Sequence, residues 1–533
     1  MREFAFRSWM SCTVLATLVC TSVAIAEAAK PSAQTHQGGL KALADDAWDY
    51  ASARHLLVRA GFGGTPAEVE DLHAMGLKKA VDFIVDYQNQ PEAEISFEAK
   101  TPQELEAQAL ETLVKKDEVY RKAQKDPTVV RKFSREQRQA FSRQRRREDQ
   151  TQMGKVRDWW MKRLVESPRP LQEKLVVFWH GHFANEYRTV RDSYAMYAQN
   201  ELFRKHAAGN FGQLLHEIVH DAAMLRYLDN NRNVKGRPNE NLAREIMELF
   251  SMGEGKYTEE DIKEAARALT GYTYNQRTCE FTFRERSHDT EEKTVFGKKG
   301  NWDGDQLVDL ILEEPITAEF IAGKLFAFFV HENPDDKIVK QLAHLLRDND
   351  YELAPTLKVL FRSQEFHSPK AMATQIKSPV QLAVGSLRDL GVRADNYAPL
   401  VRAVREMGQN LFDPPNVKGW EGGRTWVNSN RIFVRYNFVA DVLERMPGPG
   451  GQRGIDVVAA LESKDFTSSA EVVDYLAKSC FVVSLDEQRR SELIEFLGTL
   501  PPSSKWEEQK RKVNAKLLGL LVLIISTPEY QVT

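Results

Sequence analysis

Two histidines stand four positions apart in the run His216-Glu217-Ile218-Val219-His220, with a glutamate directly after the first. On one face of a helix, such a pair can bind a single zinc ion. A glutamate at this place is the general base of zinc proteases, which removes a proton from the metal-bound water. The motif therefore makes zinc-dependent hydrolysis one hypothesis for the function.

The chain beyond this motif both extends and weakens the zinc hypothesis. Asn239 and Glu240 form an Asn-Glu pair, and the arrangement resembles thermolysin-like proteases, whose third zinc ligand is the glutamate of such a pair. The resemblance implies His216, His220 and Glu240 as ligands. Glu217 would then deprotonate the bound water. However, no strand-rich segment precedes the motif to align an extended substrate, and short motifs of this kind also match by chance. We therefore favour no metal site and keep the zinc hydrolase as the alternative.

A second set of polar residues lies on the helix that follows. Glu240, Arg244 and Glu248 recur at a spacing of four, so the guanidinium can lie between two carboxylates on one side of the helix. Asn239 and Asn241 flank the start, where side-chain oxygens can cap free amides. A surface row of salt bridges would give the same pattern. Because ionic clusters also gather at functional sites, this helix is a candidate site.

Two further places in the chain contain histidines that could take part in chemistry. His182 and His180 belong to an apolar segment with helical period, which puts them on different sides of a helix. His182 is more typical of a hydrogen-bonded core histidine than of a metal ligand. His288 and Asp289 stand in a connection between expected strands, and such loops often carry acid-base residues. An ordinary polar turn fits this pair equally well.

The residues Asn301, Asp303 and Asp305 alternate like the first half of a calcium-binding loop. Gln306 stands where that loop needs glycine, and Leu312 stands where it needs the bidentate glutamate. A turn followed by a helix is the better interpretation, and a looser calcium or magnesium site is the alternative. We expect Asp305 to cap that helix.

The elements that must position these residues are mainly helices, because apolar residues recur at helical spacing along most of the chain. Between 101 and 157 the chain is strongly charged and poor in glycine, which favours either long exposed helices or a partly mobile insertion. One small β-hairpin is expected near 279–296, where Cys279–Glu285 alternates and Lys293–Phe296 can return beside it. A loop rich in glycine and tryptophan spans 416–430.

The chain divides into segments of different composition. Residues 1–26 have the basic start, apolar stretch and small-residue cleavage site of an export signal. After a leader at 27–50, we expect a main helical domain at 51–445 with a charged insertion at 101–157. A C-terminal helical unit at 455–533 should pack on it. No later stretch is long and apolar enough to span a bilayer, so we expect an exported, periplasmic or secreted protein.

The composition excludes some classes of protein. The 533 residues are 42% hydrophobic and 28% charged, which is typical of a globular protein with a large core. Lys and Arg number 73 against 76 Asp and Glu, and the net charge of −3 gives no electrostatic footprint for nucleic acid. Cys279 and Cys480 remain once the signal is removed, and they could pair or stay as buried thiols.

Several stretches together resemble the bacterial family known as domain of unknown function 1800. They are ARHLLVRAGFGGTP (53–66), LQEKLVVFWHGHFA (171–184), DAAMLRYLDN (221–230), PNENLAREIMELFSMGEGKYTEEDIKEAARALTGY (238–272), HDTEEKTVFGKKGNWDGD (288–305) and PPNVKGWEGGRTWVNSN (414–430). The resemblance implies an exported, mainly helical protein whose biochemical role the family name leaves open. His216 and His220 look particular to this chain. The family's strongest motif is matched by Asn239, Glu240, Asn241, Arg244 and Glu245.

Two hypotheses of different classes result. The first is an exported helical protein with a polar pocket built from the segments around 180, 240, 288 and 416–430. It would act as an envelope enzyme, or as a binding or assembly factor for a protein or an envelope polymer, with its cofactor left open. Its catalytic candidates are Glu240, Arg244, Glu245, His288 and Asp289. Its binding candidates are His182, Asn239, Asn241, Trp420 and Trp426. The second hypothesis is the zinc-dependent hydrolase.

Overall fold

Helices make up most of the protein, so the predicted mainly helical fold is confirmed. The structure is a computed structural model that describes residues 39–115, 117–438, 455–461, 464–482 and 485–533. Contacts join Gly39–Thr533 into one unit, and the predicted export signal at 1–26 lies outside the described residues. No helix of the described segments combines the length and apolar character needed to cross a bilayer. Cys279 and Cys480 are both free thiols.

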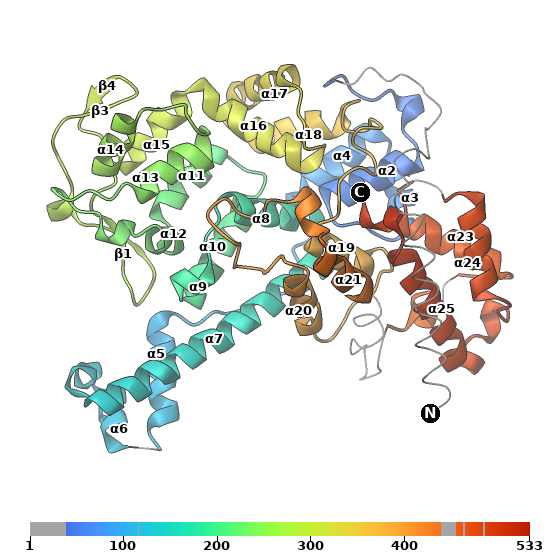
Figure 1. The fold of residues 1–533 in the computed structure, drawn as a ribbon, viewed down its shortest axis with the longest axis horizontal. Coiled ribbons are helices and arrows are strands. Elements are labelled where there is room, and N and C mark those ends of the chain that lie inside the picture. Colours follow the sequence, from blue (N-terminus) through green and yellow to red (C-terminus); the bar gives the residue numbers. More distant parts are fainter. Residues whose placement is uncertain (1–38, 116, 439–454, 462–463, 483–484) are drawn as a thin grey trace. The chain divides into compact units, whose positions relative to one another are not determined.

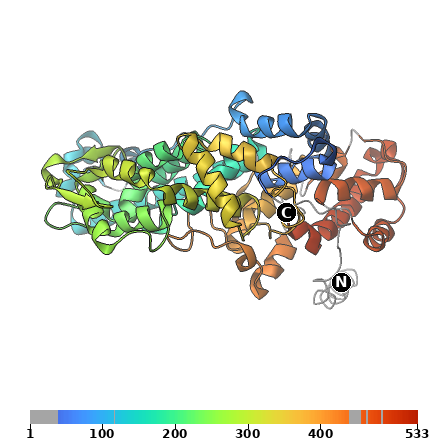
Figure 2. The same ribbon diagram turned by 90° about the horizontal axis from the view of Figure 1, so that it is seen from above.

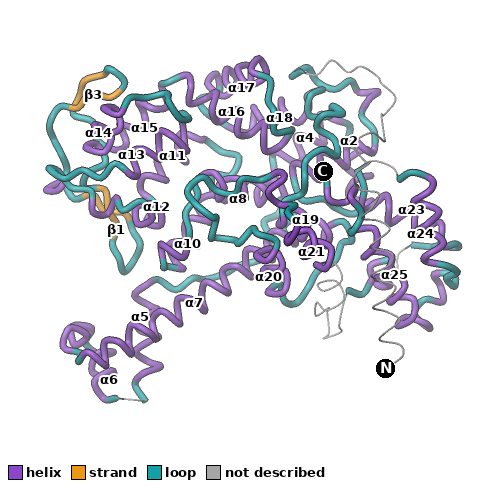
Figure 3. Tube along the Cα trace, viewed as in Figure 1, coloured by secondary structure: helices purple, strands orange, loops and turns teal. Residues whose placement is uncertain are grey.

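The helices follow one another along the chain, mostly with short connections (Figures 1 and 3). Those of the first half are α2 (Tyr50–Ala60), α3 (Pro66–Ala74), α4 (Leu77–Val85), α5 (Pro102–Leu113), α6 (Glu118–Lys125), α7 (Arg135–Glu166), α8 (Pro170–His182), α9 (Tyr187–Val190), α10 (Ser193–Lys205), α11 (Phe211–His220) and α12 (Ala222–Tyr227). Those of the second half are α13 (Asn241–Glu245), a π-helix (Ile246–Ser251), α14 (Glu259–Ala268), α15 (Gly304–Glu313), α16 (Pro315–Phe329), α17 (Asp336–Asp348), α18 (Leu353–Arg362), α19 (Pro379–Arg388), α20 (Ala398–Glu406), α21 (Ser429–Phe438), α22 (Val457–Ala460), α23 (Ser469–Cys480), α24 (Glu487–Leu497) and α25 (Lys510–Ile525).

Polar side chains at the helix starts explain where several helices begin. Thr258 and Asp261 form the predicted capping box at the start of α14. A cap of this kind stabilises a helix by about 1 kcal/mol. At α15, Asp303 is the cap in place of the predicted Asp305, because the amide of Gln306 donates to Asp303 Oδ1 at 2.9 Å. The carboxylate of Asp305 is therefore free for other partners.

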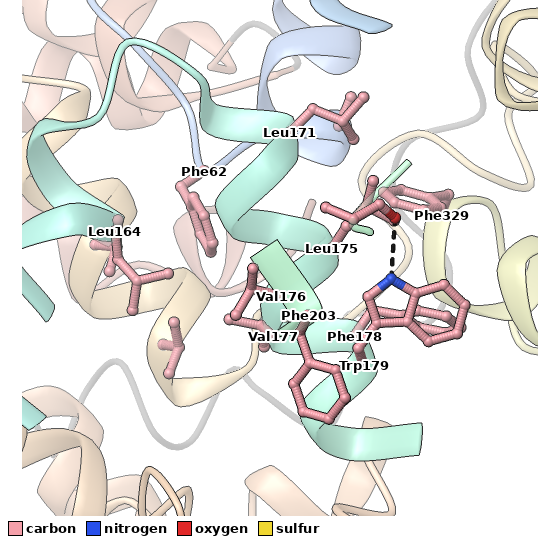
Figure 4. Packing of buried hydrophobic residues seen from close by; sticks show 14 of the residues in the cluster. Phe62, Leu164, Leu171, Leu175, Val176, Val177, Phe178, Trp179, Phe203 and Phe329 are labelled. Atoms are coloured by element: carbon pink, nitrogen blue, oxygen red, sulfur yellow. Dashed lines mark hydrogen bonds between the residues drawn. The ribbon is translucent and has the colours of Figure 1, made fainter. Parts of the chain in front are cut away.

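Helix α8 is buried on nearly all sides (Figure 4). Leu171, Leu175, Val176 and Trp179 have no exposed surface. Trp179 Nε1 also donates to the carbonyl of Ala207 at 2.9 Å, so the indole's one polar group is satisfied. Each such side chain stabilises the fold by about 1.5–3 kcal/mol. The polar residues on this helix are consequently held at fixed positions by the core.

Short strands form two separate antiparallel pairs within the described residues. The pairs are β1 (Tyr272–Tyr274) with β2 (Phe281–Phe283), and β3 (Lys293–Val295) with β4 (Lys298–Gly300). The predicted hairpin, in which the segment of β2 pairs with that of β3, is therefore wrong in its pairing. Phe296 and Gly297 both have positive φ, which is the geometry of a tight two-residue turn, and this turn gives β3 a partner immediately after it.

The charged segment predicted to form long helices contains α5, α6 and most of α7, and these helices have a hydrophobic cluster of their own. This satellite cluster consists of Ala109, Leu110, Leu113, Tyr120, Ala123, Phe133 and Phe141. The second half of α7 belongs to the main core, where Trp160 is fully buried. One helix of 32 residues therefore contributes to two hydrophobic clusters. Figure 1 labels this helix as α7, and Figure 2 shows the same ribbon from above.

One carboxylate of α8, Glu173, is completely buried between two arginines. Arg163 Nε donates to it at 2.8 Å and Arg204 Nε at 2.7 Å. Burial raises the pKa of Glu173, but the two guanidinium groups outweigh this effect and the pKa is lowered. The charge is tolerated in the core because it is paired and hydrogen-bonded.

Candidate functional site

The two histidines of the zinc motif lie on α11 and contact carboxylates of α15. Asp305 Oδ1 lies 3.1 Å from His216 Nδ1, and Asp305 Oδ2 lies 3.1 Å from His220 Nε2. Tyr272 donates its hydroxyl to Asp305 Oδ2 at 2.8 Å. Asp309 Oδ1 lies 3.1 Å from the other ring nitrogen of His216. Each histidine thus has an acidic partner that the sequence analysis assigned to a helix cap or did not consider.

The other residues of the zinc hypothesis have different partners. Glu217 lies 3.6 Å from Lys205 Nζ. Glu240 lies 3.2 Å from Arg244 Nη2, and the same guanidinium binds Glu259 at 2.8 Å. Among the described residues, no group of three or more His, Cys, Asp or Glu side chains is placed to hold a metal ion. The structure therefore does not bring the three predicted zinc ligands together.

The network around Asp305 makes the stability of the protein depend on pH. Hydrogen bonding to Asp305 raises the pKa of His216. Burial raises the pKa of Asp305, but hydrogen bonds from His216, His220 and Tyr272 outweigh it, and the pKa is lowered. The stability contributed through His216 is complete below its ordinary pKa of about 6.5 and is lost as the pH rises through the raised value. The stability contributed through Asp305 is present above pH ~4 and is lost as the pH falls.

Asp305→Asn is expected to lower the free energy of unfolding at pH 6 by about 1 kcal/mol, because the charged hydrogen bonds are lost at a half-exposed site. It should also reduce the loss of stability between pH 6 and 8.5. Urea unfolding at the two pH values measures both effects. Asp309→Asn, at a carboxylate that is 64% exposed, is the matched control with the smaller effect. An unchanged pH dependence in Asp305→Asn would contradict this account.

The predicted ladder of Glu240, Arg244 and Glu248 forms only in its first half. Glu248 accepts a hydrogen bond from Tyr257 at 2.9 Å. It does not pair with Arg244, because the π-helix begins between the two residues and widens the turn. Asn239 Oδ1 accepts from the amide of Asn241 at 3.0 Å, as predicted for residues at a helix start. Of the predicted ladder, the structure forms the partly exposed ion pair between Glu240 and Arg244.

Two of the remaining catalytic candidates, His288 and Asp289, also have partners within the fold. His288 Nδ1 lies 2.8 Å from the carbonyl of Thr270. Asp289 accepts from Arg267 Nε at 2.8 Å, and this hydrogen bond lowers the pKa of Asp289. These contacts hold the chain before β3 against the end of α14. Glu245 is half-buried, and burial raises its pKa.

A pocket of 510 Å³ is lined by residues of α8, α16, α19, the segment 375–378 and the loop 418–426. Three of the predicted binding residues line it: His182, Trp420 and Trp426. Five basic residues from five separate parts of the chain line it too, and we call it the cationic pocket after them. They are Arg59, Lys174, Lys324, Lys377 and Lys418. Among the described residues that line it, the acidic side chains are those of Glu332 and Glu421, both exposed, and Thr533 lines it as well.

The inner wall of the cationic pocket carries buried positive charge with little compensation. Arg59 is 3% exposed, and burial lowers its pKa to about 9. Lys377 is 4% exposed, and burial lowers its pKa to about 8. Asp389, which partly compensates Lys377, lies 3.3 Å from Arg54 and is already paired. Within the described part of the chain, no carboxylate is close enough to raise the pKa of Arg59 or Lys174. The pocket therefore favours a negatively charged ligand.

His182 adds a neutral hydrogen-bond acceptor to the same wall. Its Nε2 lies 2.9 Å from the carbonyl of Phe250, which is in the π-helix, so Nε2 carries the proton. Burial lowers the pKa of His182 to about 3. Its Nδ1 has no hydrogen-bond partner in the described residues, although His182 is 7% exposed. A ligand that donates an O–H or N–H group would satisfy this nitrogen.

The glycine- and tryptophan-rich loop covers the pocket through a close backbone contact. Gly419 has φ of 83°, and a Cβ atom there would overlap the carbonyl oxygen of Gly181 at the end of α8. The ring of the next residue, Trp420, lies against Gly181, and its Nε1 has no hydrogen-bond partner in the described part of the chain. Trp426 is 5% exposed. The loop thus adds two aromatic rings and one unpaired indole N–H to the site.

The segments around 240 and 288 do not line this pocket, although the first of them acts on it indirectly. The π-helix that follows α13 supplies the carbonyl that fixes the tautomer of His182. Sequence reasoning missed Arg59, Lys174 and Lys377. Arg59 has a signal in the sequence, because it interrupts an otherwise apolar helical stretch.

A comparison with known protein families found a match that includes nearly all of these elements. Residues 55–532 match the family described as protein of unknown function (DUF1800). The chain belongs to this family. The resemblance based on the sequence motifs is confirmed, and the DUF1800 match includes both the cationic pocket and the Glu240 segment. No curated protein and no solved structure matches the chain.

Proposed function

We propose that this DUF1800 protein is an exported binding factor whose cationic pocket holds an acidic, hydroxyl-bearing ligand, such as a uronic acid unit of an envelope polysaccharide. The observation that carries the proposal is the position of Arg59, Lys174 and Lys377 in one pocket with little negative charge near them. Buried cations are costly unless they are paired. A bound carboxylate supplies the missing charge.

The other polar atoms of the wall support a sugar acid over a simple anion. The free Nδ1 of His182 accepts a hydroxyl hydrogen bond, and the free Nε1 of Trp420 donates one. Trp420 and Trp426 also present apolar ring surface beside these polar atoms. A sugar acid combines a carboxylate, hydroxyl groups and apolar C–H faces, so it matches all three features.

Lys377→Met is expected to weaken binding of trigalacturonate by roughly 10- to 150-fold. The loss of a charge-assisted hydrogen bond costs about 1.5–3 kcal/mol, which corresponds to this factor. Isothermal titration calorimetry with the wild type and the variant measures it. Lys299→Met, at an exposed lysine of β4, is the matched control and should bind like the wild type.

The neutral trisaccharide maltotriose serves as the control ligand, and it should bind far more weakly than trigalacturonate. Binding of trigalacturonate should also weaken as the salt concentration rises, since salt screens exposed charges at the pocket mouth. Equal affinity for the two trisaccharides, or no binding of trigalacturonate, would overturn the proposed function.

A further inference from the structure

Lys174 has an unusual environment for a lysine, because aromatic rings and an amide surround its amino group. The residue lies on α8, and its Nζ is 4.9 Å from the centre of the Phe62 ring and 5.6 Å from that of Phe328. Its hydrogen bond among the described residues goes to Oε1 of Gln381. The side chain is partly exposed and lines the cationic pocket, so a ligand can reach it.

Two other cations lie close to this amine. Burial, Arg59 and Lys377 all lower the pKa of Lys174, in that order, and the pKa falls well below its ordinary value. None of the charges that act on Lys174 is negative. An amine in such a place gives up its proton more readily than an exposed lysine, and the neutral amine has a free electron pair and is a nucleophile. A lysine with only a structural role would instead be expected to pair with a carboxylate or to extend into solvent.

We propose that Lys174 forms an imine with the carbonyl carbon of an acid that carries a keto or aldehyde group. The proposal rests on the proposed function, because Arg59 and Lys377 would hold the carboxylate of that acid. Lys174 Nζ attacks the carbonyl carbon and forms the C–N bond. The two hydrogens of the amine leave with the carbonyl oxygen as water, so no oxidant, reductant or further reactant is needed.

The experiment traps this imine on the full-length protein. Pyruvate and sodium cyanoborohydride are added, so that any imine is reduced to a stable secondary amine, and peptide mass mapping locates the label. We expect Lys174 to be labelled at least about tenfold more than any other lysine. Acetone, which has the ketone without the carboxylate, should label Lys174 much less, and excess acetate should reduce labelling by pyruvate.

Lys174→Arg keeps the positive charge but cannot form an imine, so its label should disappear while its thermal unfolding confirms a folded protein. Mapping of the wild type gives the result even if this variant fails to fold. Labelling that is spread over surface lysines, or that is centred on Lys377, would overturn the proposal. If trigalacturonate binds but Lys174 is not labelled, the imine inference fails and the binding function stands. If acetone labels Lys174 as well as pyruvate does, the role of the cations in holding a carboxylate fails.

Discussion

Replacing Glu173 with Gln is expected to lower the free energy of unfolding by about 3–5 kcal/mol, because two buried arginines lose the one buried carboxylate that they share and keep only exposed acidic partners. Arg163 and Arg204 are each about 95% buried and both donate to this one carboxylate. The amide of glutamine keeps the size of the side chain and loses only the charge and one acceptor. Urea unfolding followed by circular dichroism measures the difference.

Glu201→Gln is the matched control, since Glu201 also pairs with Arg204 but is 42% exposed. Water screens this second pair, so its loss should cost less than about 1 kcal/mol. If the two variants were equally stable, the buried position of Glu173 would not matter, and the account of the core charges would be wrong.

Gly419→Ala is expected to detach the loop 416–430 from the end of α8. The positive φ of Gly419 costs an alanine about 1–3 kcal/mol. The new methyl group would also overlap the carbonyl of Gly181, and relieving such overpacking costs about 1–3 kcal/mol more. We expect the free energy of unfolding to fall by the sum of both costs. Affinity for trigalacturonate should fall as well, because Trp420 moves with the loop.

Gly422→Ala separates the cost of the backbone strain from the cost of the overlap with Gly181. Gly422 has a similar φ of 79°, but a Cβ atom there meets nothing within 4 Å. This variant should therefore show the backbone strain alone and keep its affinity. Equal effects of the two substitutions on stability and binding would show that the contact with Gly181 does not position the loop.

The parts of the fold that depend on residues close together in the sequence were predictable from it. The capping box at Thr258 and the helical character of the chain follow from local patterns. Strand pairing depends on which partner lies closer in space, and the turn at Phe296 and Gly297 has no strong sequence signal of its own. The prediction that Asp305 caps α15 was wrong, because Asp303 stands close by in the sequence and caps the same helix start.

The candidate site was predictable only in its conspicuous residues. Trp420 and Trp426 stand out by type, and His182 stands out by its place at the end of an apolar helix. Arg59 and Lys377 contribute through their positions in space, because they come from segments far apart in the chain. A charge in an apolar stretch suggests burial, but it does not tell which other charges lie beside it. The zinc motif shows the reverse problem, because a local pattern does not fix distant partners. His216 and His220 have the spacing of zinc ligands, but Glu240 pairs with Arg244 in the structure.

The satellite cluster affects how easily α5, α6 and the first half of α7 unfold locally. Seven side chains hold α5 and α6 against α7, and they are apart from the main core. Breaking this small set exposes little apolar surface, so the region needs much less free energy to open than the whole molecule does. Backbone amides of α5, α6 and the first half of α7 can thus exchange their hydrogens with solvent through local opening events. The second half of α7 exchanges only when the main core unfolds.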